Sequence, residues 1–80
     1  SSVIAQVQNE LGYRVSEAIE VVSNLDNYLN PEQNKIENLK AKGNHTYIAK
    51  SITQNLINKI RQVVEMVTKR TYQNHLNSLG

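Results

Sequence analysis

Apolar residues recur at helical spacing along most of this chain, and no segment shows the alternation that is typical of a strand. Between residues 3 and 29, a helical projection places aliphatic side chains on one nearly continuous stripe. The stripe consists of Ile4, Val7, Leu11, Val15, Ala18, Val22, Leu25 and Leu29. The spacing therefore predicts one long amphipathic helix over residues 3–29.

The sequence Asn30-Pro31-Glu32-Gln33 predicts the end of that helix and the start of another. Asn is a favoured N-cap residue, Pro fits the first helical turn, and Gln33 stands where the partner of a capping box belongs. A short helix over residues 31–42 is expected to follow. Gly43 would end it, because glycine adopts the left-handed conformation that closes many helices.

Helical spacing resumes after Gly43 and predicts a third helix over residues 45–74, with fraying turns beyond it. Its central stripe is Ile48, Ile52, Leu56, Ile60, Val63 and Val67, flanked by Ile57, Val64 and Met66. This apolar arc is wider than one partner helix can cover. The predicted fold is all-α, with residues 1–80 as a single domain. It is a three-helix bundle in which two long antiparallel amphipathic helices are joined by the short capped one.

The composition argues against most enzyme classes. The 80 residues include no Cys, which excludes a disulfide, a thiolate metal site and a thiol nucleophile. The two histidines, His45 and His75, fall in an expected turn and an expected tail, and neither has a metal-ligand partner at helical spacing. No glycine-rich phosphate loop occurs. The sequence therefore predicts a non-enzymatic chain without cofactor or metal.

No apolar run is long enough to cross a bilayer, so a soluble chain is expected. The compartment stays open, with the cytoplasm slightly favoured over secretion. Asn44-His45-Thr46 matches the acceptor pattern for N-glycosylation, which would matter only in a secreted protein.

The wide arc of the third helix favours a helical protein-protein interaction or assembly module that acts through helix packing. The partner would be a second copy in a homo-oligomer, or a larger protein complex. We expect apolar edges left over after packing within the chain to contact that partner, with Tyr13 as an exposed aromatic anchor. The predicted contact residues are Val3, Val7, Tyr13, Ile57, Val64 and Met66.

The charge distribution supports an alternative, a small nucleic-acid-associated regulator. The net charge is only +2, but residues 31–80 hold eight basic and three acidic side chains, whereas residues 1–30 hold one basic and four acidic. The phosphate-binding residues would be Lys50, Arg61, Lys69 and Arg70. On a helical projection Lys50 and Arg61 lie along one border of the apolar arc, and Lys59 and Arg70 lie along the other. Solubilising side chains that cover the rim of the arc are therefore the favoured interpretation.

Leu11-Gly12-Tyr13, followed by Ala18, Ile19 and Val22, resembles the first loop and second helix of ubiquitin-associated-type domains. The resemblance covers roughly residues 4–22. It implies a helix that ends at Gly12, a second helix capped by Ser16, and a binding loop formed by Leu11, Gly12 and Tyr13. The chain departs from the family pattern afterwards, because the apolar stripe stays in phase to Leu29 and then meets Asn30-Pro31.

Overall fold

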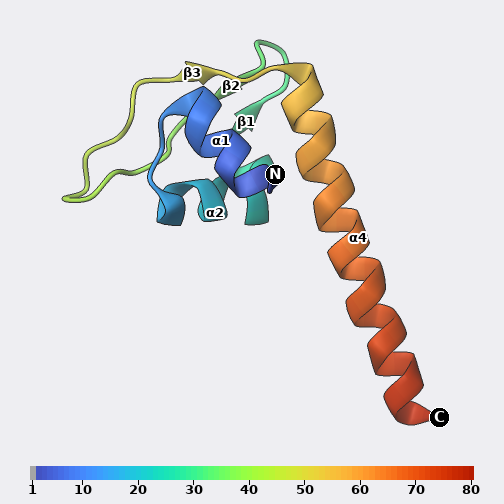
Figure 1. Ribbon diagram of the computed structural model, residues 1–80. Coiled ribbons are helices and arrows are strands. Elements are labelled where there is room, and N and C mark those ends of the chain that lie inside the picture. Colours follow the sequence, from blue (N-terminus) through green and yellow to red (C-terminus); the bar gives the residue numbers. More distant parts are fainter. Residues whose placement is uncertain (1) are drawn as a thin grey trace.

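The computed structural model describes residues 2–80 and contains helices together with a small antiparallel sheet, so the predicted all-α three-helix bundle is wrong (Figure 1). Within the described residues there are four helices and three strands. In chain order they are α1 (Val3–Leu11), α2 (Val15–Ser23), α3 (Leu25–Tyr28), β1 (Leu29–Asn30), β2 (Lys35–Ile36), β3 (Lys50–Ser51) and α4 (Gln54–Leu79).

The predicted helix over residues 3–29 is divided into α1, α2 and α3, and Gly12 makes the first division. Gly12 has a φ of +75° and donates its backbone N–H to the Gln8 carbonyl at 2.8 Å, which ends α1 as a left-handed C-cap. The Arg14 N–H then donates to Glu17 Oε1 at 2.8 Å, at the start of α2. The resemblance implied a break at Gly12 and is correct there, although Arg14 rather than Ser16 occupies the N-cap of α2.

The predicted helix over residues 31–42 is instead a turn and an extended segment. Asn30 Oδ1 accepts from the N–H groups of Glu32 and Gln33 at 3.1 and 3.4 Å, which stabilises a turn in place of a first helical turn. Asn34 and Asn38 have φ of +51° and +64°, a conformation that interrupts any helix. As a result β1 pairs antiparallel with β2, with Leu29 opposite Ile36.

The predicted helix over residues 45–74 begins later and ends later than expected. Residues 45–53 are mainly extended, because β3 pairs antiparallel with β2 and completes a sheet of order β1-β2-β3. Thr53 caps α4 by accepting from the Leu56 N–H at 3.2 Å. Ile48 therefore lies outside the helix and is 86% exposed.

The molecule has two parts, a packed body and a projecting arm (Figure 1). The body consists of α1, α2, α3, the sheet and the first turns of α4, around one cluster of buried aliphatic side chains. Its largest fully buried members are Ile36, Leu56, Ile60, Val7 and Val21. We define the arm as residues 61–79 of α4; it leaves the body and carries the C-terminus away from it (Figure 1).

The Gly12→Ala substitution distinguishes the divided helix from a continuous one. At a φ of +75° an alanine would be strained by about 1–2 kcal/mol, so we expect the free energy of unfolding to fall by that amount. In one continuous helix the same change would raise it by about 1 kcal/mol, because alanine is the better helix former. Urea denaturation followed by circular dichroism measures the sign.

Gly80→Ala is the matched control, because Gly80 lies at the chain end and has no positive φ. It should leave the unfolding curve unchanged. A Gly12→Ala protein more stable than the wild type would contradict the left-handed turn.

Candidate functional site

Three of the predicted partner contacts are core residues. Val7, Tyr13 and Ile57 are 0, 4 and 3% exposed, and all belong to the buried cluster of the body. The expectation that Tyr13 is an exposed anchor is therefore wrong. It followed from a continuous helix, in which Tyr13 would lie opposite the apolar stripe, whereas the turn at Gly12 directs the tyrosine inward.

The Lys50 ammonium contacts two aromatic rings, the buried Tyr13 and the partly buried Tyr47. The Lys50 Nζ lies 4.8 Å from the ring centroid of Tyr13 and 5.4 Å from that of Tyr47, and the two rings are 5.2 Å apart. The same Nζ donates a 2.6 Å hydrogen bond to the Leu11 carbonyl at the end of α1. These cation–π and helix-end contacts join β3 to α1. Lys50 is thus engaged within the body, which the phosphate-binding prediction did not foresee.

Glu17 is a buried charge beside these residues, at 7% exposed. Its carboxylate accepts from the Tyr47 hydroxyl at 2.9 and 3.0 Å and from the Arg14 N–H. The bond to Glu17 raises the pKa of Tyr47 above its usual value. The Tyr13 hydroxyl, by contrast, is buried without a hydrogen-bond partner among the described residues. Sequence reasoning missed this cluster, although a Glu three residues after a helix start was a usable signal.

The arm carries the remaining apolar surface. Leu56, Ile57 and Ile60 are buried, but every residue from Arg61 onward is exposed. The exposed apolar side chains of the arm are Val63, Val64, Met66, Val67, Tyr72, Leu76 and Leu79. Of the predicted contacts, Val64 at 37% and Met66 at 69% exposed lie on the arm, whereas Val3 is half-buried against the body core.

Val64 and Met66 do not share a face of the helix, because two residues rotate the direction of a side chain by about 200°. Val64 instead belongs to a row at four-residue spacing that runs from the body to the end of α4. We call this row the α4 ridge; its members are Ile60, Val64, Thr68, Tyr72 and Leu76. The two predicted partner contacts Val64 and Met66 therefore lie on different faces of α4.

A groove opens where the arm leaves the body. It has a volume of about 400 Å³ and lies between α4 and the chain from the end of α2 through α3. Val22 and Leu25 contribute from one side, Ile60 and Val64 from the other, and Asp26 and Arg61 join the two sides through a 3.0 Å ion pair. The groove is continuous with the α4 ridge, because Ile60 and Val64 belong to both.

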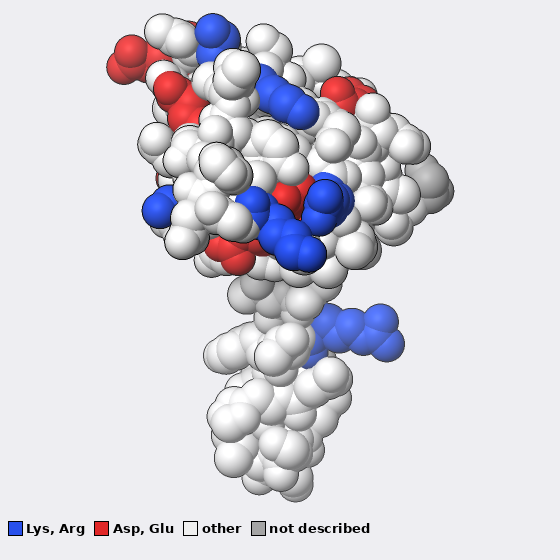
Figure 2. Space-filling model, turned by 90° about the vertical axis from the view of Figure 1, so that its left-hand side faces the viewer, with Lys and Arg blue, Asp and Glu red and all other residues white. Residues whose placement is uncertain are grey.

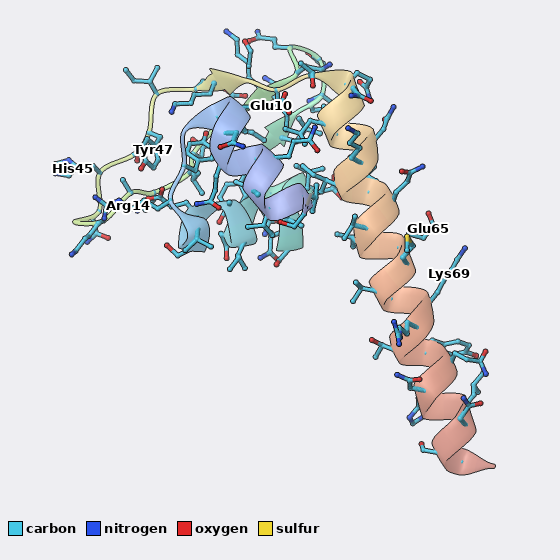
Figure 3. The ribbon with its side chains drawn as sticks, in the orientation of Figure 1. Glu10, Arg14, His45, Tyr47, Glu65 and Lys69 are labelled. Atoms are coloured by element: carbon cyan, nitrogen blue, oxygen red, sulfur yellow. The ribbon has the colours of Figure 1, made fainter. Side chains whose placement is uncertain are left out.

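Of the four basic residues of the alternative prediction, Lys50 is held in the body, whereas Arg61, Lys69 and Arg70 lie on the arm. Arg61 pairs with Asp26, and Lys69 pairs with Glu65 at 3.0 Å on neighbouring turns of the arm (Figure 3). α4 begins at Gln54, four residues after Lys50, and Lys69 lies 15 residues further along it, roughly 22 Å from the start of the helix. Figure 2 likewise shows basic side chains over the body and over the arm, with the end of the arm free of charge. These residues do not form one patch.

The described residues hold no group of three or more His, Asp or Glu side chains placed to bind a metal ion. His45 lies in the exposed loop before β3 and points away from the body (Figure 3). Over residues 2–80, no helix combines the length and the hydropathy that a bilayer crossing requires. Comparisons with protein-family models, curated proteins and solved structures found no match.

The two clustered tyrosines provide a matched pair of substitutions. Tyr47→Phe removes the donor to the buried Glu17 carboxylate, so the free energy of unfolding should fall by about 1–3 kcal/mol. Tyr13→Phe removes a hydroxyl without a partner and should be neutral or stabilising. Urea denaturation of both variants at pH 7 measures the difference. Equal losses would contradict the hydrogen-bond assignment.

Alkaline titration tests the burial of Tyr13. Burial, followed by the negative charges of ionised Tyr47 and Glu17, raises the pKa of Tyr13 from 10.0 to about 12. The unfolded chain loses this proton first, so the stabilising contribution is complete below pH 10 and is lost between pH 10 and 12. The urea midpoint of the wild type should therefore fall more steeply from pH 9 to 11 than that of Tyr13→Phe. Parallel pH profiles would contradict the prediction.

Proposed function

We propose that this chain is a non-enzymatic assembly module in which the arm of α4 packs against the same helix of a second copy. The observation that carries the proposal is the exposed α4 ridge. A helix that is buried over its first turns continues for 19 residues with every side chain exposed, and apolar residues recur along it. An unpartnered amphipathic helix of this kind is typical of an interaction surface.

The arm is poorly suited to remain helical by itself. It is rich in β-branched residues, with Val63, Val64, Val67, Thr68 and Thr71, and its last turns contain several Asn and Ser residues. These are weak helix formers. Most helices in proteins are stabilised by tertiary packing of one face, and the body of this chain supplies that packing only as far as Ile60. A partner that covers the ridge would supply the rest.

A second copy suits the charge of the arm. Glu65 and Lys69 neutralise each other within one helix, and residues 71–80 contain no Lys, Arg, Asp or Glu. Two arms can therefore approach without strong repulsion along most of their length. Rows at four-residue spacing on two helices can also interdigitate, which gives the α4 ridge a natural partner in its own copy.

The nucleic-acid alternative has weaker support. Lys50 is held by Tyr13, Tyr47 and the Leu11 carbonyl, and Arg61 and Lys69 are each paired with a carboxylate. Phosphate binding would have to compete with these contacts.

Molar mass in solution tests the proposal. Light scattering after size exclusion should give a dimer of the 9.1 kDa chain at both low and high salt, because apolar packing responds little to ionic strength. Val64→Asp places a charge on the α4 ridge and should shift the equilibrium to monomer. Met66→Asp is the matched control, since Met66 lies on the opposite side of the same helix, and it should leave the dimer intact.

Circular dichroism of both variants separates dissociation from unfolding. The body should retain its helix signal in each case, because the two positions lie beyond Ile60, the last buried residue of α4. A wild-type chain that is monomeric at both salts would sink the proposal, and equal behaviour of the two variants would sink the assignment of the face.

A further inference from the structure

We infer that the groove beside α4 in each copy receives the last turns of α4 from the second copy, so that the two arms run antiparallel and exchange their ends. The inference rests on the proposed self-association and specifies how the two copies meet. The groove, which no described side chain of the same copy fills, becomes a binding site. Tyr72, Leu76 and Leu79 at the far end of the arm become the residues that enter it.

The groove has the composition of a site for a short apolar segment. Its floor is apolar, because Val22 and Leu25 are only 8 and 6% exposed and Ile60 is fully buried, and Val64, at 37% exposed, supplies most of the accessible apolar surface. Its rim is polar and contains Ser23, Asn24, Asp26, Asn27, Arg61 and Glu65. Apolar walls with a polar rim resemble the anatomy of protein interfaces.

The end of the arm complements the groove chemically. Tyr72, Leu76 and Leu79 are 64, 42 and 71% exposed, so each has apolar surface to bury. The surrounding residues are Thr, Gln, Asn, His and Ser, which can hydrogen-bond with the Asn and Ser side chains of the rim. Residues 71–80 contain no carboxylate, so the end of the arm does not repel Asp26 or Glu65.

The length of α4 fits an antiparallel arrangement. Leu76 lies 12 residues beyond Val64, about 18 Å along the helix. With a two-fold axis beside Arg70, Leu76 of one copy is level with Val64 of the other, and Leu79 is level with Arg61. The α4 ridge turns by about 40° around the helix at each four-residue step, so it winds from the groove toward the end of the arm and Leu76 lies about 120° around α4 from Val64.

The area of an arm-to-arm contact is too small for a stable dimer. A stripe about 100° wide on a helix of about 11 Å diameter and 29 Å length covers roughly 280 Å² per copy. The pair would bury roughly 560 Å², about half of the ~1,200 Å² at the lower end for specific interfaces. Docking of the end of the arm in the groove of the other copy adds a further contact. Two-fold symmetry repeats this contact, so it occurs once at each end of the paired arms.

Disulfide trapping tests the arrangement, and the natural chain has no cysteine to interfere. The probes are two exposed positions, Asn27→Cys on the groove rim and Leu79→Cys at the end of the arm. Within one chain they cannot meet, since Leu79 stands 18 residues beyond Arg61, about 27 Å along the helix. A disulfide requires Cα atoms within about 7 Å. Mixing the two single variants under mild oxidation should therefore give a covalent dimer that contains one of each.

Each variant oxidised alone should stay unlinked, and Asn9→Cys, an exposed α1 position outside the groove lining, should not link to Leu79→Cys. Self-linkage of Leu79→Cys without the mixed product would mean that the arms are parallel. Linkage of Asn9→Cys to Leu79→Cys in the same yield as Asn27→Cys would mean random collision. Either result, or a dimer by light scattering that forms no mixed disulfide, overturns the inference and leaves the proposed function standing. A monomeric mass would instead overturn the proposed function.

Discussion

The left-handed turn at Gly12 is the constraint on which the body depends. It ends α1, directs Tyr13 into the core, and leaves the Leu11 carbonyl available to the Lys50 ammonium. That hydrogen bond spans 39 residues of sequence and fixes the strand that leads into α4. The turn near the N-terminus thus contributes to holding the strand that precedes α4.

The sequence was sufficient to predict most of the aliphatic residues that are buried in the first third of the chain, but not the full burial of Val21 or the division of the helix. Val7, Leu11, Ala18, Val22 and Leu25 belong both to the predicted stripe and to the core. Leu11 and Val15 keep helical phase across Gly12, so periodicity alone could not reveal the break. Val15, which is 53% exposed, is the residue where that reasoning failed.

The segment from Asn30 to Thr53 was harder to predict, because its structure rests on contacts distant in sequence. Its strands have two residues each, too few to show alternation. Asn30 carried a capping signal that serves a turn equally well. At the candidate site, the wide apolar arc of the third helix predicted leftover apolar surface but not an arm that projects from the body. The groove could not be predicted either, since it exists only where α3 and α4 meet.

The body holds α4 by three buried side chains, Leu56, Ile57 and Ile60, all within its first two turns. From Arg61 onward every residue of α4 is exposed, so packing against the body does not stabilise the rest of the helix. On the proposed pairing, the stability of that segment comes from mass action, and the length of ordered helix becomes a function of protein concentration. With that pairing, one chain would combine a body packed around its own core with a segment whose helical order depends on the concentration of copies.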